Sequence, residues 1–205
     1  LFVAVNKMAG PGARLSEVQE RDRGVRYDSL LKQDGWAQGH GFDFLGTYFM
    51  NVMAPLHMVA WRHREFPTYL CVYRAGQSRV TEFVTTFPDD GGLTTSTTVD
   101  GHTLANTPGD FMQAFPGKSI DELWELHNSG LVYMIQNANL QPQATGRTFC
   151  DEITHSLRSQ MAYIKTLAGW PLRGVYWYLI KRPAMRSKSI QQQHQSGRIR
   201  FLNGR

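Results

Sequence analysis

The sequence predicts an α+β fold, namely an antiparallel β-meander of five or six strands with two C-terminal helices packed on one face. Between residues 42 and 99, apolar and polar residues alternate with a period of two, as they do in half-buried strands. The connections between these runs are short, whereas parallel strands would need longer crossovers. Residues 119–136 and 149–168 then repeat apolar residues at the spacing of amphipathic helices.

The chain before the sheet is expected to be partly helical. Residues 1–12 are an apolar run that ends at Gly10-Pro11-Gly12 and is too short to span a bilayer. Because the chain begins with Leu, we expect a fragment or a processed form, in which this run is a first strand or the end of a longer hydrophobic segment. Residues 14–36 have a helical period that Gly24 is expected to divide.

The predicted strands are separated by turn sequences. Asp89, Asp90 and the two glycines after them have the composition of a hairpin turn. The apolar run 111–115 is a candidate sixth strand. Strand and turn requirements explain the polar residues of the stretch 66–98, so we interpret this stretch as scaffold. The five main runs span residues 42–53, 56–64, 68–74, 80–87 and 93–99.

Local signals mark the ends of the two long helices. Ser119 and Glu122 have the spacing of a capping box, in which each side chain bonds the other residue's backbone N–H. The second helix is expected to begin near Phe149. The sequence Gly169-Trp170-Pro171 interrupts it, because proline lacks the amide hydrogen that a helix interior requires.

The charge is distributed unevenly along the chain. Residues 1–182 are expected to form one domain, and residues 183–205 a basic, Gln-rich, flexible tail. All 17 acidic residues lie at or before Glu152, where 12 Lys and Arg give residues 1–152 a net charge of −5. Residues 153–205 carry 10 Lys and Arg and no acid. Such an end favours an anionic partner, which could be a lipid headgroup, a nucleic acid or an acidic protein face.

The same end of the chain combines aromatic residues with cations. Aromatic side chains at an apolar boundary flanked by cations are typical of a membrane interface, although the segment is too short to span a bilayer. One alternative is a last core element with a solvated basic tail. Nucleic-acid binding fits less well, because the cations lie mostly downstream of the aromatic residues. The candidate membrane or partner contacts are Trp170, Arg173, Tyr176, Trp177, Lys181 and Arg182.

A second candidate site is a polar and aromatic face of the predicted sheet, which could line a ligand cavity between sheet and helices. The histidines at its two ends stand six residues apart, or about 20 Å along a strand, so they cannot bind one metal ion together. The alternative is an ordinary, partly exposed strand face. The candidate ligand-binding residues are His57, Trp61, His63, Tyr69 and Tyr73.

No catalytic, metal or cofactor motif is evident. The sequence contains no zinc-ligand spacing, no Walker loop and no dinucleotide fingerprint. Ser96 lacks the glycines of a nucleophile elbow. The cysteines, Cys71 and Cys150, are expected to be free thiols, because a disulfide-stabilised secreted fold would need more of them. We therefore expect no cofactor, and a location in the cytoplasm or at the cytoplasmic face of a membrane.

The run FPTYLCVYRAGQSRVTEFVTTFPDDGGLTTSTT, followed by PGDFMQAFPGKSIDELWELH, resembles an uncharacterised bacterial protein family. Members of that family have a sheet segment that ends in phenylalanine, an acidic-Gly turn and a Leu-Thr-Thr strand, followed by a Pro-Gly loop and a short helix. The resemblance covers residues 66–127 and implies a shared scaffold, with no activity and no functional residues to carry over. It also implies membrane association, which some members show.

The predicted function is a non-enzymatic binding or interaction module, peripheral to a membrane through its basic aromatic end. The first alternative is a small-ligand-binding protein or an enzyme that uses a cavity between the sheet and the helices. The second alternative is a nucleic-acid-binding protein that uses the same basic end.

Overall fold

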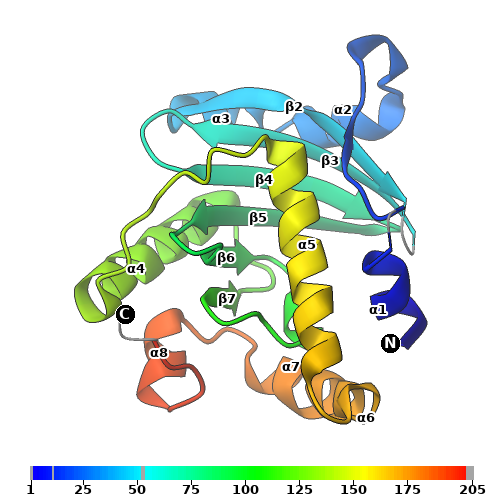
Figure 1. Cartoon of the computed structure of the whole chain (residues 1–205). Helices are drawn as coiled ribbons and strands as arrows, with labels where there is room; N and C mark the ends of the chain where they lie inside the picture. Colours follow the sequence, from blue (N-terminus) through cyan, green and yellow to red (C-terminus); the bar gives the residue numbers. More distant parts are fainter. Residues whose placement is uncertain (1, 11, 52–53, 202–205) are drawn as a thin grey trace.

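The computed structural model describes residues 2–10, 12–51 and 54–201, which fold around a seven-stranded sheet (Figure 1). The strands lie in the sheet in the order of the chain. All neighbouring pairs are antiparallel except the last, which is parallel. The strands are β1 (Ser16–Glu17), β2 (Phe42–Asn51), β3 (Pro55–His63), β4 (Thr68–Ala75), β5 (Ser78–Thr86), β6 (Gly92–Ser96) and β7 (Asp110–Ala114).

The helices lie around this sheet, and the chain also contains three short helical turns. The α-helices are α1 (Phe2–Met8), α2 (Val25–Leu31), α3 (Asp34–Gly39), α4 (Ile120–Ala138), α5 (Phe149–Thr166), α6 (Trp170–Tyr176), α7 (Arg182–Ala184) and α8 (Ile190–Gln195). The turns are η1 (Glu20–Asp22), η2 (Asp100–Thr103) and η3 (Trp177–Lys181), of which η3 is a π-helical turn that continues α6.

The α+β class and the mostly antiparallel sheet are confirmed, whereas the number of strands differs from the prediction. The additional strand, β1, has only two residues, which pair with Phe49 and Tyr48 of β2. Two residues are too few to show a strand period in the sequence. The run at residues 111–115 does form a strand, β7, but η2 and its flanking loop return the chain so that β7 runs parallel to β6. Residues 2–8 form a helix rather than a first strand.

The two long helices lie on opposite faces of the sheet, which corrects the prediction that both pack on one face. Val59 and Trp61 of β3 share a buried cluster with Leu123 of α4. Ala60, the residue between them, shares another cluster with Phe149 of α5. In Figure 1, α5 crosses the near face of the sheet. Both faces of the central strands are apolar, so each needs its own cover.

Part of the segment predicted as a flexible tail, residues 183–205, is folded. Helix α8 begins with a capping box at Ser189, and the backbone N–H of Ile190 donates to Gln113 Oε1 at 3.0 Å. The Gln193 amide donates to the carbonyl oxygen of Met112 at 2.9 Å. Glutamine therefore binds α8 to the β7 strand, although a Gln-rich composition is typical of disordered segments.

At Gly130, α4 approaches the sheet closely. A Cβ atom there would lie 2.9 Å from Gln113 Nε2 and 3.2 Å from Leu93 Cδ2. That Gln113 amide already donates to Thr95 Oγ1 and to the carbonyl oxygen of Leu126. A side chain at this position must therefore displace a buried hydrogen-bonded group or move the helix.

We expect Gly130→Leu to lower the free energy of unfolding by about 1–3 kcal/mol, because it overpacks the contact between α4 and the sheet. Urea unfolding at neutral pH measures the change. Ser129→Leu places the same side chain at the exposed neighbouring position and is expected to change the free energy by about 0.5 kcal/mol or less. Equal effects of the two substitutions would contradict the close approach at Gly130.

Candidate functional site

The five residues predicted to line a ligand site do not share one face of the sheet. Trp61 pairs with Leu70, and Arg62 pairs with Tyr69, so the odd-numbered residues of β3 share a face with the even-numbered residues of β4. The candidates of β3 therefore lie on the α4 side, and Tyr69 and Tyr73 lie on the α5 side. The prediction assumed the other register between the two strands.

The three candidates of β3 have structural contacts on the α4 side. Trp61 is fully buried, and its indole N–H donates to Asp34 Oδ1 at 2.9 Å. His63 Nδ1 accepts from the backbone N–H groups of Glu65 and Phe66, at 3.1 and 3.2 Å. These bonds anchor the indole ring in the core and shape the turn between β3 and β4.

His57 lies at the other end of β3, where its Nδ1 is 3.2 Å from the Tyr27 hydroxyl and its Nε2 is 3.2 Å from Arg26 Nη1. Partial burial, and then the positive charge of Arg26, lower the pKa of His57. A neutral imidazole is the form that fits between a tyrosine and an arginine. His57 therefore holds α2 against the strand.

On the opposite face, α5 leaves a cleft above the sheet. Two adjoining cavities lie there, of about 470 and 260 Å³. Val84 and Thr94 belong to interior strands but remain half-exposed, although a helix that sealed this face would bury them. The lining residues common to both cavities are Glu82, Val84, Thr94, Ile153, Ser156 and Gln160, which makes the cleft continuous.

Glu82 lies where the two cavities meet. Its Oε1 accepts from the Tyr73 hydroxyl at 2.9 Å and from Ser96 Oγ at 2.8 Å. The side chain is half-buried, and it faces the cleft because it lines both cavities. Burial raises the pKa of Glu82, although the two hydroxyl donors act in the opposite direction. Of the predicted ligand-binding residues, Tyr73 and Tyr69 reach this cleft.

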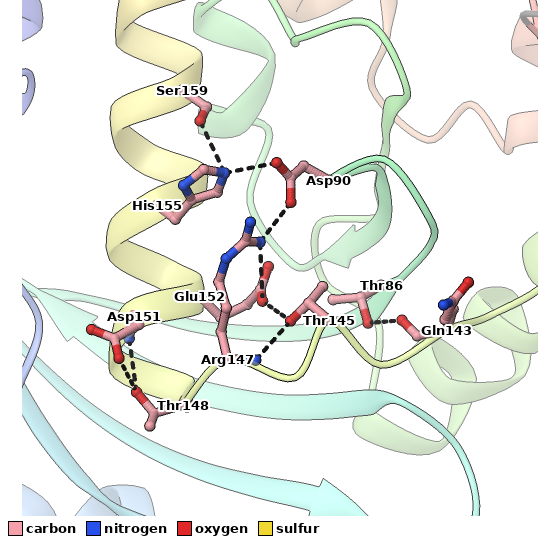
Figure 2. A network of polar contacts seen from close by, with 10 residues as sticks. All are labelled: Thr86, Asp90, Gln143, Thr145, Arg147, Thr148, Asp151, Glu152, His155 and Ser159. Carbon is pink, nitrogen blue, oxygen red and sulfur yellow. Dashed lines mark hydrogen bonds and ion pairs between the residues drawn. The ribbon is translucent and has the colours of Figure 1, made fainter.

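One end of the cleft is lined by residues of a polar network, shown in Figure 2. Arg147 Nη1 donates to Asp90 Oδ1 at 2.5 Å and lies 3.7 Å from Glu152 Oε2. Asp90 Oδ2 lies 2.9 Å from His155 Nε2. The hydrogen bonds from Arg147, and then from His155, lower the pKa of Asp90. The network joins the β5–β6 turn to the first half of α5.

The residues Asp90, His155 and Ser159 have the composition of a catalytic triad but not its geometry. Ser159 Oγ lies 3.4 Å from His155 Nε2, the same nitrogen that contacts Asp90. In a working triad the carboxylate and the nucleophilic hydroxyl bond opposite nitrogens of the ring. This arrangement therefore does not activate Ser159 through His155.

The C-terminal segment provides a different kind of surface. Among the described residues, nine large apolar side chains are exposed, and six of them lie between residues 172 and 180. We call these six the apolar patch, and their exposed fractions range from 55% to 80%. The patch consists of Leu172, Val175, Tyr176, Tyr178, Leu179 and Ile180.

The six residues predicted to contact a membrane or partner divide into exposed and buried members. Arg173 and Tyr176 are exposed, whereas Trp177 is buried with Met161 and Ile164 of α5. Trp170 packs against the same cluster. The cations at the end of the segment, Lys181 and Arg182, bond to groups within the protein.

Lys181 and Arg182 bond to the loop between β6 and β7. Lys181 Nζ donates to the carbonyl oxygen of Leu104 at 2.8 Å, and burial lowers the pKa of Lys181 to about 8. Arg182 Nη2 donates to Asp100 Oδ1 at 2.7 Å. These two residues therefore anchor the segment to the loop. The apolar patch consists of the residues that precede them in the chain.

The apolar members of the patch, such as Leu172 and Leu179, were absent from the predicted contacts. A signal for them exists in the sequence, because the segment 170–180 is apolar on all sides of the helix. A short helix that contacts a core on one side must expose the rest of such a surface. The prediction emphasised aromatic and basic residues and so missed the aliphatic ones.

Comparisons with protein-family models, with curated proteins and with solved structures found no match to this chain. The resemblance of residues 66–127 to a bacterial family therefore stays a prediction. In the described part of the chain, no helix is long and apolar enough to cross a membrane. Within the same residues, no three His, Cys, Asp or Glu side chains gather as metal ligands. Cys71 and Cys150 are free thiols.

Proposed function

We propose that this protein is a non-enzymatic module that binds the surface of an anionic membrane through the apolar patch at residues 172–180. The observation that supports the proposal is the concentration of six exposed large apolar side chains in nine residues. Soluble monomers rarely expose such a contiguous patch unless it binds something. Burying one of these side chains in a membrane would contribute roughly 1.5–3 kcal/mol.

The charge around the patch favours an anionic surface over an apolar protein partner. Arg173 is exposed and lies in the chain between Leu172 and Val175 of the patch. Lys165 precedes the patch in the chain, Arg186 and Lys188 follow it, and all three are exposed. The sequence contains no acidic residue after Glu152. Each such cation contributes about 1 kcal/mol near an anionic lipid surface. The cytoplasmic leaflet carries such lipids, so we propose binding at that face.

The mixture of side chains in the patch also suits a membrane interface. Tyr176 and Tyr178 place an apolar ring beside a hydroxyl, which is the character of residues at the headgroup level. Nucleic-acid binding would instead need aromatic residues interleaved with cations along a groove. In this segment four aliphatic residues accompany the two tyrosines, which favours lipid.

Co-sedimentation with vesicles tests the proposal. We expect the intact chain to bind vesicles of phosphatidylcholine with phosphatidylserine, and to bind less in high salt because the cations are screened. The double variant Leu172→Ser/Leu179→Ser is expected to bind at least about tenfold more weakly, since each loss exceeds about 1.4 kcal/mol. A matched control is Val132→Ser, which removes an exposed apolar side chain from α4 and is expected to leave binding unchanged.

Three outcomes would overturn the proposal. The first is an absence of binding to any vesicle at low salt. The second is a concentration-dependent dimer that the double variant abolishes, since the patch would then bind a second copy of the chain. The third is tight, steeply salt-dependent binding to RNA or DNA without binding to vesicles.

A further inference from the structure

The cleft between α5 and the sheet has the shape of a ligand site, independently of the apolar patch. Its floor is formed by residues of strands β2 to β7, and its roof by α5. Glu82, Val84 and Thr94 lie in the middle of the sheet and are only half-buried, whereas an ordinary packed helix would cover them completely. The combined volume of the two cavities is in the range of small-molecule sites.

The two ends of the cleft differ in chemistry. The larger cavity is mostly apolar, and its lining includes the flexible side chains Met8, Met50 and Met58, which adapt to ligands of varied shape. The smaller cavity has more charged and polar residues in its lining, such as Asp90, Asp110 and His155, and it leads to the network of Figure 2. A molecule that fills both must have an apolar part and a polar part.

The carboxyl group of Glu82 stands at the boundary between these two ends. Both of its hydrogen bonds within the protein use Oε1, which leaves Oε2 for a ligand. The neighbouring Cys71 thiol is neutral, because burial raises its pKa far above its usual range. Burying an unpaired carboxylate is unfavourable, so a donor or a cation beside Glu82 would be stabilised there.

The other carboxyl groups of the cleft already have partners. Asp90 bonds Arg147 and His155, and Glu152 lies near the same arginine. Asp100, at the far wall, accepts from Arg182. Among the described residues that line the cleft, these ion pairs leave Glu82 and Asp110 as the carboxyl groups without a basic partner.

Asp110 accepts a hydrogen bond from Thr107, and burial raises its pKa to about 6. Among the described residues, no lysine or arginine lines either cavity. An anionic headgroup would therefore meet carboxyl groups, and Arg147 at the end of the cleft is already paired with Asp90. A cationic headgroup would neutralise Glu82, the carboxyl group at the boundary between the two cavities.

We propose that this cleft binds a small amphipathic amine, with the ammonium group at Glu82 and the hydrocarbon part in the methionine-lined cavity. The proposal is independent of membrane docking, because none of the lining residues belongs to the apolar patch. The ammonium group would donate to Glu82 Oε2, and charge-assisted hydrogen bonds of this kind are stronger than neutral ones.

Titration of the intact chain with dodecylamine, dodecanol and dodecanoate below their micellar concentrations tests this assignment. We expect the amine to bind at least about tenfold more tightly than the other two. The methyl resonances of Met50 and Met58 are expected to shift on addition of the amine. The variant Glu82→Gln keeps an oxygen to accept from Tyr73 and Ser96, and it is expected to lose at least about tenfold in amine affinity but not in alcohol affinity.

Two further variants separate the cleft from other sites. Glu125→Gln removes an exposed carboxylate from the other face and is expected to leave amine binding unchanged. Leu172→Ser/Leu179→Ser changes the apolar patch and is also expected to leave it unchanged. The proposal is overturned if dodecanoate binds best, if Glu82→Gln binds the amine as the native chain does, if the patch variant loses amine binding, or if no probe shifts the two methionines.

Discussion

Replacing Trp61 by alanine is expected to lower the free energy of unfolding by roughly 3–5 kcal/mol, which is the usual cost of removing a buried aromatic side chain. Trp61 is fully buried among Val59, Leu70 and Phe83. Its loss would also remove the hydrogen bond that the indole N–H donates to Asp34. Because small domains are stable by only about 5–15 kcal/mol, the variant is expected to unfold at a much lower urea concentration.

Trp61→Phe separates the two contributions. It retains an aromatic ring and removes the hydrogen bond to Asp34, so we expect a loss of about 1–2 kcal/mol. Tyr178→Ala removes an aromatic side chain that is 55% exposed and is expected to change the free energy by about 0.5 kcal/mol or less. If Trp61→Ala unfolded at the same urea concentration as the native chain, the core position of this residue would be wrong.

Acid is expected to destabilise the fold through His127, a fully buried residue of α4. Its Nε2 and Nδ1 each lie 2.8 Å from a threonine hydroxyl, of Thr85 and Thr95 respectively. Burial lowers the pKa of His127 from 6.5 to about 3. In the unfolded chain, His127 therefore becomes protonated below about pH 6.5. In the folded chain, it stays neutral down to about pH 3.

The free energy of unfolding is thus expected to fall by about 1.4 kcal/mol per pH unit through His127 as the pH drops below 6.5. Other groups titrate in the same range, including Asp110, whose raised pKa acts in the opposite direction. The quantity to measure is therefore the difference in pH dependence between the native chain and a variant without His127. Between pH 7 and pH 5, the native chain should lose about 2 kcal/mol more than His127→Asn does.

His40→Asn provides the matched control for this titration, because His40 is exposed. Urea unfolding of the native chain and the two variants at both pH values gives the comparison. The His127 variant is expected to depend less on pH than the native chain and the His40 variant do. Parallel behaviour of all three would show that His127 does not titrate with unfolding.

Features that depend on neighbouring residues could be predicted from the sequence. The capping box of Ser119 and Glu122 is present at the start of α4. Asp89 and Asp90 adopt positive φ values of 58° and 60° in the predicted turn, and the backbone N–H of Phe87 donates to the carbonyl oxygen of Gly91. Such features involve a few consecutive residues, whose side chains decide the backbone conformation.

The faces of the sheet could not be assigned in the same way. Alternation shows which residues of one strand point together, but the register between strands decides which residues of two strands do so. His57 and Tyr73 were predicted to share a cavity, and the pairing of β3 with β4 places them on opposite faces. The same pairing places Tyr73 on the side of the sheet that α5 covers.

The sequence by itself determined the α+β class, the starts of the long helices, the turn at Asp89 and the basic character of the C-terminal end. Only the tertiary structure decided that α4 and α5 lie on opposite faces, that Glu82 stands in a cleft, and that aliphatic residues of the segment 172–180 remain exposed. The physical reason is the range of the interactions. The hydrogen bonds of caps and turns form within a few consecutive residues. Burial instead depends on which distant segment packs against each surface.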